Sequence, residues 1–164
     1  MNGELERLVD QLERVFAGRA WHGPSLLGAL RGVDAAAASW RPGPDRHDIW
    51  EIVLHAAFWK HMVRRRLGEE AGQFPRLPRD WPRPPERRTE AAWREDLALL
   101  RAEHAALIAA ARALDGARLD ERAGRWTRAQ LLFGIAAHDA YHAGQIRLIV
   151  KMLEGARGRR RVRA

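Results

Sequence analysis

The chain has 164 residues, 46% of them hydrophobic and 30% charged, and its formal net charge is +8. This length and this balance are typical of one globular domain, and they exclude an intrinsically disordered chain, which would hold fewer apolar residues. The chain contains no cysteine, which excludes a disulfide framework and a thiolate zinc site, so any metal ligand must be a histidine or a carboxylate.

The excess positive charge is concentrated at one end of the sequence. Arginines of the C-terminal segment supply five of the eight excess charges, which leaves +3 for residues 1–155. We therefore predict one domain over residues 1–155, followed by a disordered Arg-rich tail over residues 156–164, and we do not expect a nucleic-acid partner. The sequence also shows no secretion signal and no run of about 18 consecutive apolar residues. We expect a cytoplasmic protein that does not cross a membrane.

In chain order, four long segments show the apolar spacing of amphipathic helices, and proline or glycine interrupts the sequence between them. We predict helices over residues 3–17, 48–67, 89–114 and 127–154, the last ending before Gly155, with a shorter helical piece over residues 26–30. Asp48 and Glu51 have the spacing of a capping box at the start of the second long helix. Residues 72–87 contain five prolines and predict an extended loop. Because no strand pattern of useful length is present, the sequence predicts an all-α four-helix bundle.

Three histidines lie on apolar faces of these predicted helices. His138 and His142 are four residues apart on the fourth helix, so they project from one face about one turn from each other. His55 lies on an apolar stripe of the second helix that includes Ile52 and Trp59. Three neutral imidazoles from two helices would hold one divalent metal ion and leave coordination positions open. The alternative is three separate core histidines, each with its own hydrogen bond.

Three further residues are candidates for supporting or catalytic roles near these histidines. Gln145 lies one turn beyond His142 and could bond to a ligand histidine or to a metal-bound water, or instead to a neighbouring helix. Glu51 could be a general base, although its place in the capping box is the favoured role. His104 lies in the apolar seam of the third helix and is a candidate fourth ligand.

Other polar residues near the same motifs are expected at the surface. Asp139 is rotated by about 100° from His138 around the helix axis, which favours a solvated surface charge. His47 and His61 are also expected to be exposed.

Three passages carry a resemblance to a known family. They are residues 21–25 (Trp-His-Gly-Pro-Ser), residues 49–55 (Ile-Trp-Glu-Ile-Val-Leu-His) and residues 138–146 (His-Asp-Ala-Tyr-His-Ala-Gly-Gln-Ile). In this order and with this helix layout, the chain resembles the DinB-like, or YfiT-like, superfamily of metal-dependent bacterial enzymes. The resemblance implies a four-helix bundle with a long crossover connection. It also implies one metal ligand on the second helix and a pair on the fourth, roles that carry over to His55, His138 and His142.

The resemblance also implies a function. Characterised relatives include thiol-dependent transferases and isomerases that use low-molecular-weight thiols, and homodimers are common among them. We therefore expect a divalent-metal-dependent enzyme, of the thiol-dependent S-transferase or isomerase kind, that acts on a small molecule. Nickel or zinc is the expected ion, with iron and manganese as alternatives. Two other functions stay open, namely a metal-dependent hydrolase and a non-catalytic metal-binding protein of the stress response.

Overall fold

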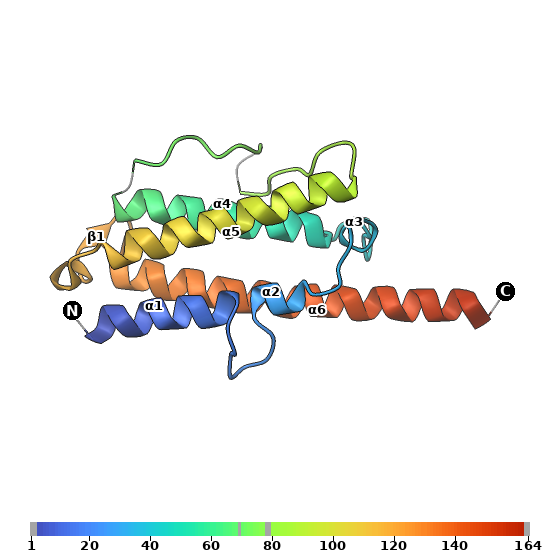
Figure 1. Cartoon of the computed structure of the whole chain (residues 1–164), viewed down its shortest axis with the longest axis horizontal. Coiled ribbons are helices and arrows are strands. Elements are labelled where there is room, and N and C mark those ends of the chain that lie inside the picture. The colour runs from blue at the N-terminus through green and yellow to red at the C-terminus, as the bar shows by residue number, and fades with distance from the viewer. Residues whose placement is uncertain (1–2, 69, 78–79, 163–164) are drawn as a thin grey trace.

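The computed structural model describes residues 3–68, 70–77 and 80–162. Four long helices dominate it: α1 (Gly3–Phe16), α4 (Ile49–Leu67), α5 (Glu90–Arg112) and α6 (Arg128–Val162) (Figure 1). Shorter elements join them, namely helices α2 (Leu26–Ala29) and α3 (Ala35–Ala38), a 3-10 turn at Gly116–Arg118, and a hairpin of strands β1 (Arg122–Ala123) and β2 (Trp126–Thr127). The prediction of an all-α four-helix bundle is confirmed.

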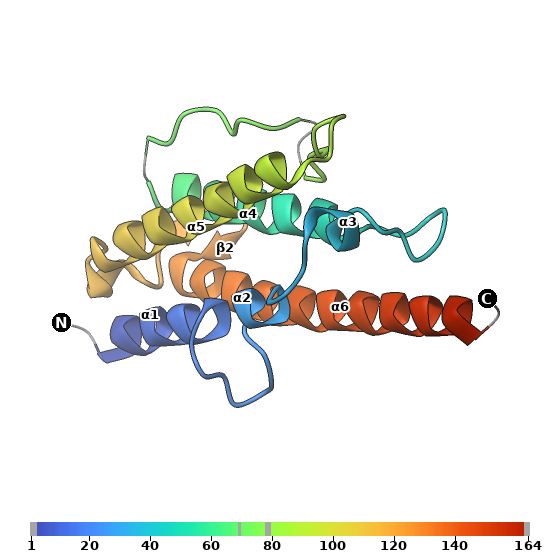
Figure 2. The ribbon, with the colours of Figure 1, turned by 45° about the vertical axis from the view of Figure 1, so that its right-hand side comes forward.

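The long helices form two parallel pairs that run in opposite directions. Helices α1 and α6 run one way, and α4 and α5 run the other way, as both Figure 1 and Figure 2 show. Two consecutive parallel helices need a connection that returns along the bundle, and the chain between α4 and α5 makes this long crossover. Helix α4 packs against both α5 and α6. None of the helices described is long and apolar enough to cross a membrane.

The starts and ends of the helices follow from local capping groups. Asp48 and Glu51 form the predicted capping box at the start of α4, in which each side chain accepts a hydrogen bond from the other residue's backbone N–H. The Thr89 side chain accepts from the backbone of Ala92 and caps α5. Gly68 ends α4 with φ +105°, a left-handed conformation that glycine adopts without steric cost.

The largest side chains of the core are tryptophans whose indole N–H groups are hydrogen-bonded. Trp50 on α4 is fully buried and donates a hydrogen bond to Asp96 Oδ2 on α5 at 2.8 Å. Arg76 of the crossover donates two hydrogen bonds to the other oxygen of the same carboxylate, at 2.8 and 3.1 Å. The indole of Trp93 packs edge-on against Trp50 and donates to the Val33 carbonyl at 2.9 Å. These contacts join α4 and α5 to the crossover and to the α2–α3 segment.

The prediction that the fourth helix ends near residue 154 is wrong. Helix α6 continues through Gly155 to Val162, so residues 156–162, predicted as a disordered tail, are helical, and residues 163–164 lie outside those described. This stretch contains two glycines, Gly155 and Gly158, and each costs about 1 kcal/mol relative to alanine inside a helix. The arginines that follow are good helix formers, and positive charge near a helix C-terminus is favourable. In both views the end of α6 extends past the other long helices (Figure 2).

Candidate metal centre

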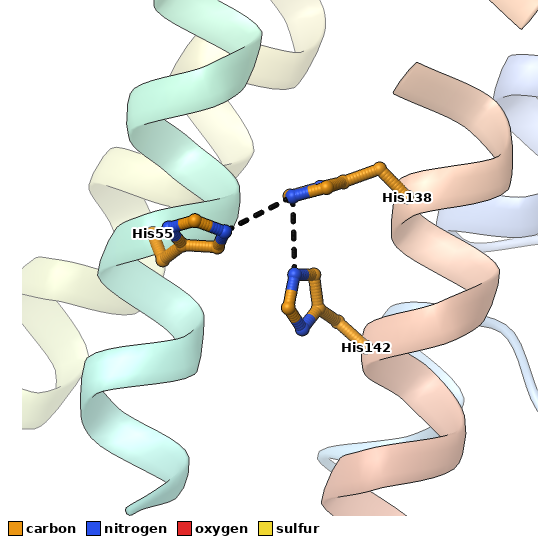
Figure 3. A group of neighbouring side chains, drawn as sticks. All are labelled: His55, His138 and His142. Atoms are coloured by element: carbon orange, nitrogen blue, oxygen red, sulfur yellow. Dashed lines mark hydrogen bonds between the residues drawn. The ribbon is translucent and has the colours of Figure 1, made fainter. Parts of the chain in front are cut away.

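The structure brings together the three histidines that the sequence singles out. His55 projects from α4, and His138 and His142 project from α6 toward it (Figure 3). The Nε2 atom of His138 lies 3.1 Å from Nε2 of His55 and 3.1 Å from Nε2 of His142. Among the residues described, these three form a group whose ligand atoms all lie within 4.8 Å of one another, as a metal site requires. The site joins two helices that are far apart in the sequence.

The outer nitrogen atoms of two of these histidines have fixed partners. His55 Nδ1 lies 2.6 Å from the backbone carbonyl of Asp80, and His142 Nδ1 lies 2.7 Å from Gln145 Oε1. The amide of Gln145 is oriented by its other end, because Nε2 donates to the Tyr141 hydroxyl at 2.9 Å. Both partners of the imidazoles are acceptors, so both Nδ1 atoms carry the proton. The Nε2 atoms of His55 and His142 therefore present lone pairs to the site.

Lone pairs that converge on one point repel one another, and a cation placed between them removes this repulsion. A neutral His138 has a single N–H and could satisfy only one of its two neighbours through Nε2. Metal–nitrogen bonds are about 2.0–2.1 Å long, so Nε2 atoms that lie 3.1 Å apart could reach the same ion. An all-nitrogen donor set suits zinc, nickel or iron. The three residues therefore fit one divalent metal ion.

The electrostatic setting keeps these imidazoles neutral, which is the form that binds metals. Burial is the main cause of a lowered pKa at all three, and it brings the pKa of His138 to about 3 and that of His142 to about 4. Neighbouring imidazoles and the Lys60 ammonium add to the shift at His138 and His142. The site is therefore uncharged near neutral pH and ready to accept a cation.

Aromatic rings close one side of the site. Trp81 of the crossover stacks on His55 with ring centroids 3.8 Å apart, and His47 stacks on the outer face of Trp81 at 3.5 Å. Trp59 lies edge-on to His55 and donates a hydrogen bond to Asp80 Oδ1 at 2.8 Å. The crossover thus supplies both a ring that covers His55 and the carbonyl that fixes its tautomer.

The site opens into a cavity of about 880 Å³ that all three histidines line, together with Trp81 and His47. Its walls come from the loop over residues 42–47, from α4 and from α6. Ile52, Leu148 and Met152 give it apolar surface, and Tyr141 and Gln145 place polar groups near His142. A cavity of this size, largely apolar and with a few polar groups, is typical of a small-molecule site. A separate cavity of about 620 Å³ reaches His138 from the side of α1.

The structure places the other candidate residues in different roles. Gln145 bonds to His142, as one of its two predicted roles required. Glu51 belongs to the capping box and also bonds to Arg41 and His47. His104 is buried in a stack with Phe16, at 3.6 Å between ring centroids, and does not belong to the histidine group.

Two predictions of surface exposure are wrong. Asp139 is fully buried and forms an ion pair with Lys60, which is also fully buried and lies 5.1 Å from the centre of the Phe16 ring. Burial raises the pKa of Asp139 and lowers that of Lys60, and the attraction between the charges opposes both shifts. His61 is buried too and contacts Glu103 on α5 at 3.3 Å. His47 is exposed, as predicted.

Two residues beside the site were missed by sequence reasoning: Lys60 and Asp80. Lys60 follows His55 by five residues and faces α6 instead of solvent. A lysine inside an otherwise apolar stretch of a helix is a signal that could have found it. Asp80 lies in a loop, where no periodicity indicates which way a side chain points.

Fold and site together define a class of helical proteins in which a bundle presents a histidine cluster able to hold one metal ion. Comparison of the sequence with family models identifies the superfamily within that class. The model of the DinB superfamily matches residues 20–146, well over half of the chain, and the chain belongs to that superfamily. Searches of curated proteins and of solved structures found no match.

Proposed function

We propose that this protein is a divalent-metal-dependent enzyme that acts on a small molecule bound beside His55, His138 and His142. One observation carries the proposal: three Nε2 atoms converge at the wall of a cavity of about 880 Å³. A metal that only stabilises a fold has a closed set of protein ligands, whereas a catalytic site keeps positions open toward solvent or substrate. The arrangement therefore favours catalysis over a structural role.

The residues around the cavity have separate tasks in this proposal. A bound divalent ion would supply Lewis-acid chemistry and lower the pKa of a thiol or water nucleophile. Asp80 and Gln145 fix the tautomers of His55 and His142. Trp81 excludes water from one face of His55. The apolar wall that includes Leu148 would hold the carbon skeleton of a substrate.

The reaction class is proposed from the family. The thiol-dependent S-transferases and isomerases among the family's characterised members make thiol transfer the leading candidate, with nickel or zinc as the ion. Hydrolysis is the alternative reaction that the same residues would support. Both require a metal, and a thiol requirement separates them.

The test combines metal analysis with an activity assay. The wild-type protein, purified without an affinity tag, should contain about one metal ion per chain, and His55→Ala, His138→Ala and His142→Ala should each lose it while the helical circular dichroism persists. His22→Ala is the matched control, because His22 is an exposed histidine outside the group. Thiol transfer to an electrophilic probe should stop on chelation and return when the metal is restored.

Two results would contradict the proposal. A wild-type chain that stays metal-free after reconstitution with nickel, zinc, manganese and ferrous iron has no metal site. A metal that cannot be removed without unfolding, and that leaves the chain inactive toward both thiol transfer and hydrolysis, indicates a structural role.

A further inference from the structure

We propose that Asp139, held by Lys60, orients the metal ligand His138 through a bridging water molecule. The inference rests on the proposed metal site and adds to it a positioning residue and its counter-charge. It assigns a task to a buried ion pair that lies next to the site and that metal ligation itself does not require.

The first observation is an asymmetry among the three histidines. His55 and His142 each have an acceptor at Nδ1, whereas Nδ1 of His138 is buried and has no hydrogen-bond partner in the part of the chain described. A histidine that binds a metal through Nε2 carries its proton on Nδ1, and that N–H is normally donated to a carboxylate, a carbonyl or a water. His138 therefore needs an acceptor.

The second observation is an acceptor that lacks a donor. Asp139 is the next residue, and it is fully buried. Its Oδ2 atom pairs with Lys60, while its Oδ1 atom is buried and has no partner among the described residues. A buried water molecule is stable where it finds two to four polar partners. His138 Nδ1–H, Asp139 Oδ1 and the remaining N–H groups of Lys60 would provide them.

The third observation is where the ion pair lies. Lys60 is on α4, five residues after His55, and Asp139 is on α6, one residue after His138. The pair therefore joins the two helices that supply the ligands, close to the ligands themselves. The Lys60 charge acts on both His138 and His142. Buried ion pairs are poor stabilisers, because apolar replacements of similar volume are often neutral or better. Stability alone therefore does not account for the Lys60–Asp139 pair, whereas a role in positioning His138 does.

The experiment replaces the pair by apolar side chains of similar size. The double variant Lys60→Met/Asp139→Leu should keep the helical circular dichroism and a wild-type melting temperature. Cobalt(II) titrated into the metal-free protein should bind about 10–100-fold more weakly, the usual cost of losing an outer partner of a ligand histidine. The visible absorption of the bound cobalt should also change, because it reports ligand geometry and a purely structural role would not move it.

A matched control replaces a different ion pair of α4. Arg64 pairs with Glu103 on α5 at 2.7 Å, so this pair joins α4 to a helix that carries none of the three ligands. The variant Arg64→Met/Glu103→Met should therefore bind cobalt with unchanged affinity and an unchanged spectrum, whatever its melting temperature.

The outcomes separate this inference from the proposed function. A wild-type chain that does not bind cobalt, nickel or zinc overturns the metal site and this inference with it. A wild-type chain that binds, beside a folded Lys60→Met/Asp139→Leu variant with the same affinity and spectrum, overturns this inference alone.

If the double variant does not fold, the zinc-loaded wild type and Asp139→Asn decide the matter by nitrogen-edited NMR of the imidazole protons. The inference predicts a His138 Nδ1 proton that is protected from exchange. Asp139→Asn should shift its resonance more than those of His55 and His142. A His138 proton that exchanges freely, or that does not respond to Asp139→Asn, overturns the inference.

Discussion

The backbone carbonyl of Asp80 accepts a hydrogen bond from Nδ1 of His55 at 2.6 Å, so that a loop residue fixes the tautomer of a histidine 25 positions earlier in the chain. Asp80 adopts φ +72°, in the left-handed region that residues other than glycine, asparagine and aspartate rarely occupy. Backbone strain of this kind costs on the order of 1–3 kcal/mol and persists only where surrounding contacts enforce it. Here the hydrogen bonds to His55 and Trp59 enforce it.

This relationship predicts a difference between two variants of Asp80. Asp80→Gly keeps the left-handed backbone at no steric cost, so the carbonyl should stay on His55 and metal affinity should remain within a few-fold of wild type, by the permissiveness of glycine. Asp80→Val places a β-branched residue where φ is positive, and affinity should fall by about 10–100-fold. Both variants lose the hydrogen bond from Trp59. The difference between their metal affinities, measured by competition with a chelator, therefore reports the effect of the Asp80 carbonyl alone. Equal affinities would show that the carbonyl does not matter.

His104 makes the metal-free protein sensitive to acid. Burial, and then the charge of Lys60, lowers the pKa of His104 from 6.5 to about 3. Between pH 6.5 and pH 3 the unfolded chain binds a proton at His104 that the folded chain does not bind. The free energy of unfolding is therefore highest above pH 6.5 and decreases as the pH falls toward 3. His104→Phe keeps a ring against Phe16 and has no group to protonate. The variant should therefore avoid the loss of about 2 kcal/mol in unfolding free energy that His104 causes at pH 5. Urea denaturation of both proteins at pH 7 and pH 5 measures it, and parallel pH profiles would contradict the assignment.

Asp96 is the carboxylate whose loss should cost the most stability away from the histidine site. It is fully buried and accepts from both Trp50 and Arg76. Asp96→Ala leaves a buried indole N–H and a partly buried guanidinium without their acceptor, and should lower the free energy of unfolding by about 2–4 kcal/mol. The control is Asp10→Ala, which breaks only the exposed pair with Arg14 and should leave the urea midpoint nearly unchanged. If both variants lost a similar amount of unfolding free energy, the buried hydrogen bonds of Asp96 would stabilise the fold no more than the exposed pair does.

Two glycines should respond to alanine in opposite directions. Gly68 ends α4 at φ +105°, so Gly68→Ala should destabilise the fold by about 1 kcal/mol. Gly134 lies inside α6, and a Cβ atom there would meet nothing within 4 Å. Gly134→Ala should therefore stabilise the helix by about 0.5–1 kcal/mol. Denaturation midpoints that move in the same direction would contradict this account of the two positions.

The bundle and the histidine cluster could be predicted because both depend on helical periodicity. The apolar stripe around His55 and the four-residue spacing of His138 and His142 place these side chains on core-facing surfaces, and the long helices then bring those surfaces together. The capping box of Asp48 and Glu51 depends on adjacent residues only, and it was predicted for the same reason.

The errors occur where burial depends on a partner that periodicity does not show. Asp139 was assigned to the surface because it is rotated away from His138, but α6 contacts α1, α2 and α4 and buries a wide face. A carboxylate can enter that face because Lys60 neutralises it. The contribution of Asp80 depends on how the crossover lies over α4, and that path is set by tertiary contacts, including the hydrogen bonds between Arg76 and Asp96.

The order in which the chain is made gives the separation of the ligands a consequence for assembly. His55 precedes His138 by 83 residues, with the whole crossover and α5 between them. During synthesis from the N-terminus, α4 and α5 can associate while only one of the three imidazoles exists, and a single imidazole holds a metal weakly. Under the proposed function, a metal ion would therefore be captured late, after α6 has docked against α4, and a nascent chain stalled before α6 would lack two of the three ligands.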